Sequence, residues 1–273
     1  MLFSFEVPIS YMKKFDKVND YHFILAHMLQ RDKDYAKFYK YSSKYKILDN
    51  GCAELGESID FDILLKLAVD FKVNVLVLPD VWMDKKSTLR RSLNFLQILK
   101  ANKNNKKLKN MKFMFVVQGK TVRELQDCIN TFIINKFRWV NQFNIIYGLP
   151  YLTCAKICGI ISPNNRDDDV TFARIYLFQK LKLYTFTSDC HLLGAGFNFT
   201  QELSFMRHFK QIKTVDTSTP FVLALNNIKL DKYGLFDRAI NKSGTLNFYE
   251  PFNKKVLQIA IHNANIIKRS GKL

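Results

Sequence analysis

Short, almost uninterrupted apolar runs recur along this chain, and most are followed by a segment with helical spacing. The clearest runs are residues 73–78 and 111–117. Such runs are typical of strands that are buried on both faces, as in a parallel sheet covered by helices. Strand and helix alternate at least six times, which predicts an α/β protein built around a parallel sheet.

The alternation favours a (β/α)8 barrel over a doubly wound sheet, because no glycine-rich dinucleotide fingerprint follows the early strands. Seven strands are predicted, at residues 3–9, 45–48, 73–78, 111–117, 143–147, 183–193 and 212–216. Residues 22–41 are predicted as a helix, and residues 221–247 resist assignment, so we expect an irregular last strand. The 273 residues suit a single barrel domain spanning residues 1–273, since neither a repeat nor a low-complexity linker divides them.

Two helices carry recognisable start signals. Residues 58–71 are predicted as a helix with Ser58 as its N-cap. Residues 121–132 begin with a capping box formed by Thr121 and Glu124. Further helices are predicted at residues 87–99, 170–181, 200–209 and 254–268, with a polar loop at residues 164–169.

The charge balance constrains the partners. Lys and Arg number 42 against 24 Asp and Glu, which gives a formal net charge of +18. Such a field favours polyanions, nucleic acid first and an anionic membrane second. Lysines are densest at residues 100–109, where the alternative interpretation is a solvated loop.

Cysteine usage and hydropathy indicate a cytoplasmic protein, in the host cell if the source is viral. The five cysteines are scattered and odd in number, which fits a reducing compartment. No apolar run approaches the roughly 20 residues of a membrane span, and residues 1–11 do not resemble a signal peptide. Cys154 and Cys158 lie four apart without further ligands, so no metal is expected there.

Polar residues and glycines gather at the predicted strand ends. In a parallel barrel these ends share one rim, where reactive side chains are found. The candidates are Asp49, Gly51, Asp80, Gln118, Gly148, Gly194 and Asp216. Gln118 can donate and accept, Asp80 can accept from a purine edge, and the glycines would allow a ligand close to the backbone.

Two of these aspartates form a chemically useful pair. Exchanging a base on a sugar needs a nucleophile at the anomeric carbon and an acid/base for the departing and entering bases. Two of the strand-end aspartates could supply both. The alternative interpretation is structural: aspartates at strand ends also cap helices or form turns, Gln118 could satisfy buried backbone groups, and His191 is interpreted as a core residue rather than a catalyst.

Six short segments, in order, resemble the tRNA-guanine transglycosylases and their DNA-modifying phage relatives, which install 7-deazaguanines. The segments are residues 49–51, 77–80, 116–119, 148–149, 191–196 and 215–218. The resemblance implies a barrel in which Asp216 is the nucleophile and Asp49 the general acid/base. It also implies that Asp80, Gln118 and the backbone of Gly148 hold guanine.

Departures from the family pattern shape the expected partner. The family's cysteine zinc ligands are missing, although residues 261–263 resemble the segment with its fourth ligand, so His262 would be a remnant and no cofactor is expected. Ala53 stands where the family has a stacking aromatic, and Pro150 and Tyr151 interrupt the segment after Gly148. The chain is short and has no appended RNA-binding domain, which favours DNA over tRNA. The sequence leaves open whether the protein is a homodimer.

The expected function is therefore exchange of guanine in nucleic acid for a 7-deazaguanine through a covalent aspartyl-glycosyl intermediate. Two alternatives stay open. One is an inactive, transglycosylase-like subunit that only binds nucleic acid. The other is a nucleoside or sugar hydrolase, in which paired carboxylates activate water.

Overall fold

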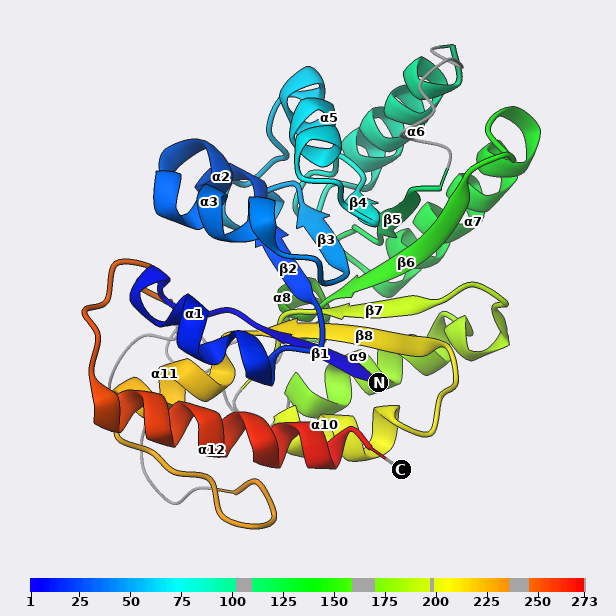
Figure 1. Ribbon diagram of the computed structural model, residues 1–273. Coiled ribbons are helices and arrows are strands. Elements are labelled where there is room, and N and C mark those ends of the chain that lie inside the picture. The colour runs from blue at the N-terminus through cyan, green and yellow to red at the C-terminus, as the bar shows by residue number, and fades with distance from the viewer. Residues whose placement is uncertain (102–109, 159–169, 197–198, 236–245, 273) are drawn as a thin grey trace.

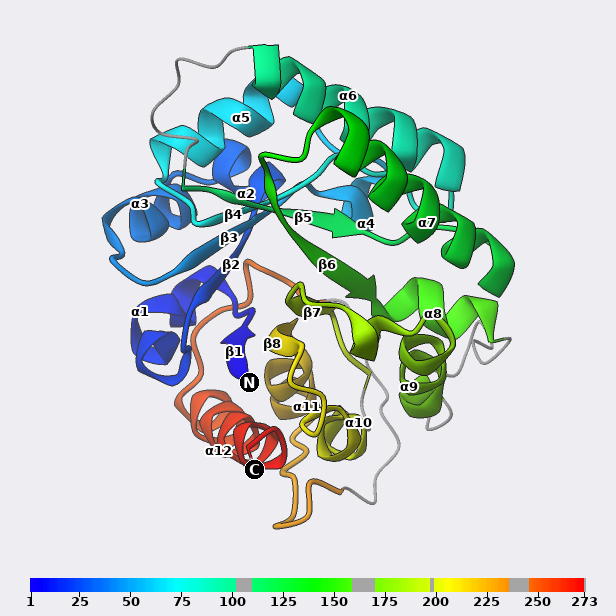
Figure 2. The same cartoon turned by 90° about the vertical axis from the view of Figure 1, so that its right-hand side faces the viewer.

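The computed structural model describes residues 1–101, 110–158, 170–196, 199–235 and 246–272. Its centre is a parallel sheet of eight strands in the order β1-β8-β7-β6-β5-β4-β3-β2. The sheet curls into a nearly closed barrel with helices around it, as Figures 1 and 2 show. The strands are β1 (Leu2–Phe5), β2 (His22–Leu25), β3 (Lys46–Asp49), β4 (Val75–Val77), β5 (Lys112–Val116), β6 (Asn144–Pro150), β7 (Cys190–Leu193) and β8 (Ile212–Thr217).

Helices follow the strands and cover the outside of the barrel (Figure 1). The α-helices are α1 (Met12–Phe15), α2 (Ala26–Arg31), α3 (Lys33–Tyr41), α4 (Cys52–Leu55), α5 (Phe61–Asp70), α6 (Lys85–Ala101), α7 (Val122–Trp139), α8 (Tyr151–Ile157), α9 (Val170–Lys180), α10 (Phe199–Met206), α11 (Thr219–Leu225) and α12 (Lys254–Ser270). Short 3-10 turns lie at Ile9–Tyr11, Asp16–Val18 and Leu183–Thr185. Among the described residues, none of these helices combines the length and apolar character needed to cross a membrane.

The barrel confirms the predicted fold, but the strand missing from the sequence prediction is the second, not the last. Residues 22–41 were expected to form one helix and instead form β2, α2 and α3. All four residues of β2 are buried, so its apolar pattern runs on into the apolar face of α2 without a visible break. Asp32 separates the two helices, accepting a 2.8 Å hydrogen bond from the backbone N–H of Tyr35. The last strand, β8, spans six residues, with one register shift against β7 at Cys190 and His191.

Of the two helix N-caps predicted from the sequence, one is confirmed and the other is wrong. Thr121 does cap α7, accepting from the backbone N–H of Glu124 at 3.1 Å. The cap of α5 is Asp60 rather than Ser58, because the Asp60 carboxylate accepts from Asp62 and Ile63 N–H groups at 2.9 and 3.3 Å.

Side chains close the seam between β1 and β2, which have no backbone ladder. The hydroxyl of Ser4 accepts from the Phe23 N–H at 2.8 Å. Asn19 pairs with both backbone groups of Phe5, accepting at 2.8 Å and donating at 3.1 Å, and Asp20 accepts from Phe3 at 3.0 Å. Buried backbone groups need such partners. The backbone groups at the seam therefore have side-chain partners although β1 and β2 form no ladder, and β1 pairs with β8.

The C-terminal helix packs on this part of the barrel. α12 lies against α11 and α10, and Lys268 of α12 pairs with Asp20 at the seam. At Gly271, just beyond α12, an added Cβ would lie 2.4 Å from the ring of Phe3, so only glycine lets the chain pass this closely. Both chain ends thus meet at one side of the barrel (Figure 2).

Candidate active site

The predicted site residues lie at or near the carboxyl ends of the strands. Asp49 is the last residue of β3. Asp216 is the second-last residue of β8, where it pairs with Ser4 of β1. Asp80 and Gln118 follow β4 and β5 by a few residues, Gly148 lies within β6, and Gly194 follows β7 directly. Because parallel strands end at one rim, these residues lie toward the same end of the barrel.

Asp216 is only 4% exposed and is held by donors on two sides. Its Oδ1 lies 2.9 Å from Nε2 of His191. The backbone N–H of Gly194 lies 3.2 Å from both carboxylate oxygens. When Asp216 is ionised, Nε2–H of His191 is the donor of this bond, because a carboxylate only accepts hydrogen bonds. The arrangement orients both oxygens of Asp216, as a nucleophilic carboxylate requires.

His191 is itself fixed from several directions. Nδ1 lies 2.7 Å from the hydroxyl of Thr214, which donates to it when the ring is neutral. The ring of Phe23 stacks on the imidazole at 5.4 Å between centroids with an interplanar angle of 5°. His191 is fully buried, as the sequence analysis expected of a core residue, but it contacts Asp216 directly. It therefore positions the carboxylate.

Asp49 is buried beside other acidic groups. Burial raises the pKa of its carboxyl well above the usual range, and the negative charges of Glu54, Asp80 and Asp216 raise it further. The Gly51 N–H, which donates to Oδ2 of Asp49 at 2.8 Å, opposes the shift. Asp49 is thus protonated over a wider pH range than an exposed aspartate, so it can donate a proton.

Gly51 is required by the turn after β3. Its φ of 83° lies in the left-handed region that favours glycine. A Cβ at this position would meet Leu55 Cδ1 at 3.3 Å and His27 Nδ1 at 3.4 Å. The turn starts α4 and brings Glu54 of that helix to the barrel mouth.

Asp80 and Gln118 form one buried network with Asn50. Asn50 Nδ2 donates to Asp80 Oδ1 and Gln118 Nε2 donates to Asp80 Oδ2, both at 2.7 Å. The Gln118 carbonyl accepts from the Met83 N–H at 3.0 Å and from the Thr153 hydroxyl at 3.1 Å. Part of the hydrogen-bonding capacity expected to read a base is therefore used within the protein. The Cys52 side chain also hydrogen-bonds to the Asp80 carboxylate. The second N–H of Gln118 is the donor left for a ligand.

Gly148 and Gly194 were expected to let a ligand approach the backbone, but the structure gives each a different role. A Cβ at Gly148 would lie 2.8 Å from Leu193 Cδ1 and 3.0 Å from Met114 Sδ, so packing inside the barrel requires glycine there. Gly194 has a φ of 67° and directs its N–H at Asp216. Close approach of a ligand is not needed to explain either glycine.

Arg174 holds the loop that contains Gly194. Its guanidinium is fully buried, and Nη2 donates to Glu202 Oε2 at 2.7 Å. Nη1 donates to the carbonyl oxygens of Leu193 and Gly194, both at 3.0 Å, and to that of Leu149 at 3.3 Å. A single side chain thus ties the ends of β6 and β7 together and fixes the peptide whose N–H faces Asp216.

Sequence reasoning missed three residues at the mouth: Glu6, Glu54 and His27. Glu6 follows β1, and its N–H donates to the Thr217 carbonyl at 3.1 Å. Burial raises the pKa of Glu6 well above its usual range, with further contributions from Asp216, Glu54 and Asp49. His27, after β2, lies 4.0 Å from Glu54, and burial lowers its pKa. Glu6 fell inside the predicted strand 3–9 and His27 inside the predicted helix 22–41, so neither stood at a predicted strand end; the structure ends β1 at Phe5 and β2 at Leu25.

The residues that could be compared with a zinc site do not fit one. Nε2 of His262 lies 2.8 Å from the Leu230 carbonyl and donates to it, so this ring is engaged in the fold. Within the described ranges, no group of three or more His, Cys, Asp and Glu side chains has a geometry that could hold a metal ion. The lysines at 103, 106, 107 and 109 and the polar loop at 164–169 lie outside the described residues.

No protein-family model matches the chain, and no curated protein matches it. The barrel and the geometry of its mouth therefore carry the functional interpretation.

Proposed function

We propose that the protein exchanges guanine in nucleic acid for a 7-deazaguanine base, with Asp216 as nucleophile. The observation that supports this most directly is the pairing at the mouth. Asp216 is buried and oriented by His191 and Gly194, while Asp49 and Glu6 have pKa values raised by burial and by neighbouring negative charges. A carboxylate beside protonated carboxylic acids is the combination that covalent sugar chemistry needs.

In the proposed reaction, an oxygen of Asp216 attacks the anomeric carbon of a guanosine nucleotide. The glycosidic bond breaks, and its electrons leave with guanine, which takes a proton from Asp49. The incoming 7-deazaguanine then gives its ring N–H proton back to Asp49. Its nitrogen attacks the same carbon, which releases Asp216, so that no oxidant or reductant is consumed.

Glu6 adds a second acid to this scheme. Its pKa is raised in part by Asp216, so the two carboxyls influence each other across paired strands. A proton on Glu6 lowers the negative charge around Asp216 while the base departs. We assign Asp49 the transfer to the base because the Gly51 N–H fixes its carboxyl.

The nucleic-acid partner follows from charge and from access. The net charge of +18 supports binding to a phosphate backbone. The target guanine has to leave its stack to reach a barrel mouth, so the protein would take single strands or flip the base.

A nucleoside or sugar hydrolase is the second candidate, because the same carboxyl pair could activate water. The observation that favours it is the mutual hydrogen bond of Asp80 and Gln118, which leaves less capacity to read a base. Incubation of DNA and of tRNA with radiolabelled guanine separates the two. The proposal predicts labelled polymer, whereas free base released without incorporation would support the hydrolase.

A matched pair of variants keeps this test specific. Asp216→Asn should abolish incorporation, because an amide cannot form the glycosyl ester. Asp34→Asn, which changes an exposed aspartate on α3, should leave it unchanged. Incorporation by Asp216→Asn at the rate of the parent protein would contradict the proposal.

A further inference from the structure

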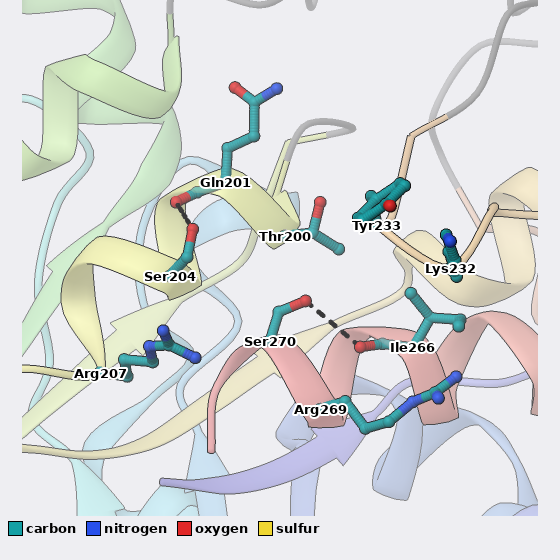
Figure 3. Close-up of a pocket in the computed structure, with 9 residues that line it drawn as sticks. All are labelled: Thr200, Gln201, Ser204, Arg207, Lys232, Tyr233, Ile266, Arg269 and Ser270. Carbon is teal, nitrogen blue, oxygen red and sulfur yellow. Dashed lines mark hydrogen bonds between the residues drawn. The ribbon is translucent and has the colours of Figure 1, made fainter. Parts of the chain in front are cut away.

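A cavity of about 280 Å³ lies outside the barrel, between α10, the end of α12 and residues 232–233 (Figure 3). Residues from three separate segments form its wall, among them Thr200, Ser204, Arg207, Lys232, Tyr233 and Arg269. Its lining residues belong to α10, α12 and residues 232–233, whereas Asp216 belongs to strand β8. Its size suits one phosphate-bearing group rather than a large apolar ligand.

The wall is cationic. Arg207, Lys232 and Arg269 contribute to it, and no residue of the wall is acidic. In the described part of the chain, none of the three forms an ion pair. The C-terminal ends of α10 and α12 offset about one unit of this charge, since each contributes roughly half a negative charge. A positive excess remains for an anion.

Arg207 has hydrogen-bonding capacity that the protein does not use. Its Nη1 donates to the Lys272 carbonyl at 3.0 Å. Its Nε is enclosed and has no hydrogen-bond partner among the residues that the structure describes. An enclosed donor without an acceptor is unfavourable, and a phosphate oxygen is a strong acceptor for a guanidinium.

An exposed aromatic ring stands at the edge of the cavity. Tyr233 is 68% exposed, and Nζ of Lys232 lies 4.8 Å from its ring centroid. Figure 3 shows the two side chains together on the side of the cavity opposite Ser204 and Arg207. Cations that follow a phosphate backbone, combined with aromatic rings that stack on bases, are typical of single-strand binding surfaces.

We propose that this cavity binds a backbone phosphate of single-stranded nucleic acid and that Tyr233 stacks on the adjacent base. The inference rests on the proposed function in one respect, the class of partner. It adds a place where the polymer is held away from the base-exchange site.

An oligothymidylate with a fluorescent end label is the probe, because it contains no guanine for the exchange site. Anisotropy titrations at several salt concentrations measure its affinity. Arg207→Gln combined with Arg269→Gln should weaken binding and reduce the salt slope by about one, as expected for one lost phosphate contact. Tyr233→Leu should weaken binding about tenfold, whereas Tyr233→Phe should retain it, because stacking needs only the ring.

The control removes two exposed charges elsewhere, with Lys37→Gln combined with Lys40→Gln on α3. Its effect should be clearly smaller if binding is local. An equal loss in the control, or unchanged affinity in the cavity variants, would overturn the inference. Thermal unfolding of each variant confirms that it is folded.

The outcomes also separate this site from the base-exchange proposal. Weakened oligothymidylate binding in the cavity variants, with no guanine incorporation by the parent protein, would support the cavity and contradict base exchange. If the parent protein incorporates guanine and the cavity variants keep the oligothymidylate affinity of the parent, base exchange is supported and the cavity proposal is contradicted.

Discussion

At the scale of single residues, the chemistry depends on which carboxyls keep their protons. Asp49 and Glu6 are acids whose pKa values are raised by burial and by like charges. Asp216 instead receives hydrogen bonds from His191 and Gly194. The proposed reaction needs both kinds of group within one mouth. A change that neutralises either kind should lower activity without a matching loss of stability.

Glu6→Gln should stabilise the protein and slow base exchange. A carboxyl whose pKa is raised on folding binds more protons in the native state, so its contribution to the free energy of unfolding falls as pH rises above the unfolded value of about 4.3. The amide introduced by Glu6→Gln carries no charge, so the variant does not lose this part of the free energy of unfolding as pH rises. The midpoint of thermal unfolding should match the parent at pH 4 and exceed it at pH 8, by roughly 2–4 °C for each 1 kcal/mol in a chain of this size. A midpoint at pH 8 below that of the parent would contradict the account.

Base exchange should also slow as pH rises. Loss of the protons on Asp49 and Glu6 removes the acid that assists the departing guanine. The rate should therefore fall at a pH above the ordinary carboxyl range, and Glu6→Gln should alter the shape of this profile. A rate independent of pH from 5 to 9 would argue against an acid with a raised pKa.

At the scale of elements, side chains support two places in the barrel: the paired ends of β6 and β7, and the seam between β1 and β2. Arg174 ties the ends of β6 and β7 to Glu202 of α10, and Ser4 joins β1 to β2. The first arrangement sets the direction of the Gly194 N–H. The second closes the barrel between β1 and β2, while the pairing of β1 with β8 places Glu6 beside β8.

Arg174→Met should destabilise the protein by about 3–5 kcal/mol, because Glu202 would be left buried without its partner. Adding Glu202→Leu should recover much of that stability, since a buried ion pair can be replaced by apolar side chains. Base exchange should stay low in the double variant, because the Leu193 carbonyl, in the same peptide as the Gly194 N–H, is no longer held. Recovery of both stability and exchange would show that Arg174 does not position the loop. Urea unfolding and guanine incorporation measure the two effects.

Ser4→Ala should cost about 1–3 kcal/mol in urea unfolding, because it leaves the buried Phe23 N–H without an acceptor. Ser10→Ala is the control, since the Ser10 hydroxyl donates to the Glu250 carbonyl at an exposed site. Equal and small effects of both changes would mean that the Ser4 hydrogen bond does not hold the seam.

At the scale of the whole molecule, local pattern predicted the architecture and missed what depends on pairing. The apolar run at residues 73–78 contains β4, and the alternation predicted the barrel. β2 was missed because its four buried residues continue into α2. Glu6 was missed because its environment depends on Asp216, which is 210 residues away in sequence and one strand away in space. Gly148 was identified, but its reason is packing against side chains from neighbouring strands.

The central claim is that the Asp216 carboxylate bonds covalently to a sugar. The most direct measurement is mass spectrometry of peptides from protein that has been incubated with a guanine-containing oligonucleotide and denatured before the second base is added. The account predicts a nucleotide adduct on the peptide containing residue 216, and no adduct in Asp216→Asn. An adduct on a different residue, or guanine exchange without any adduct, would contradict it.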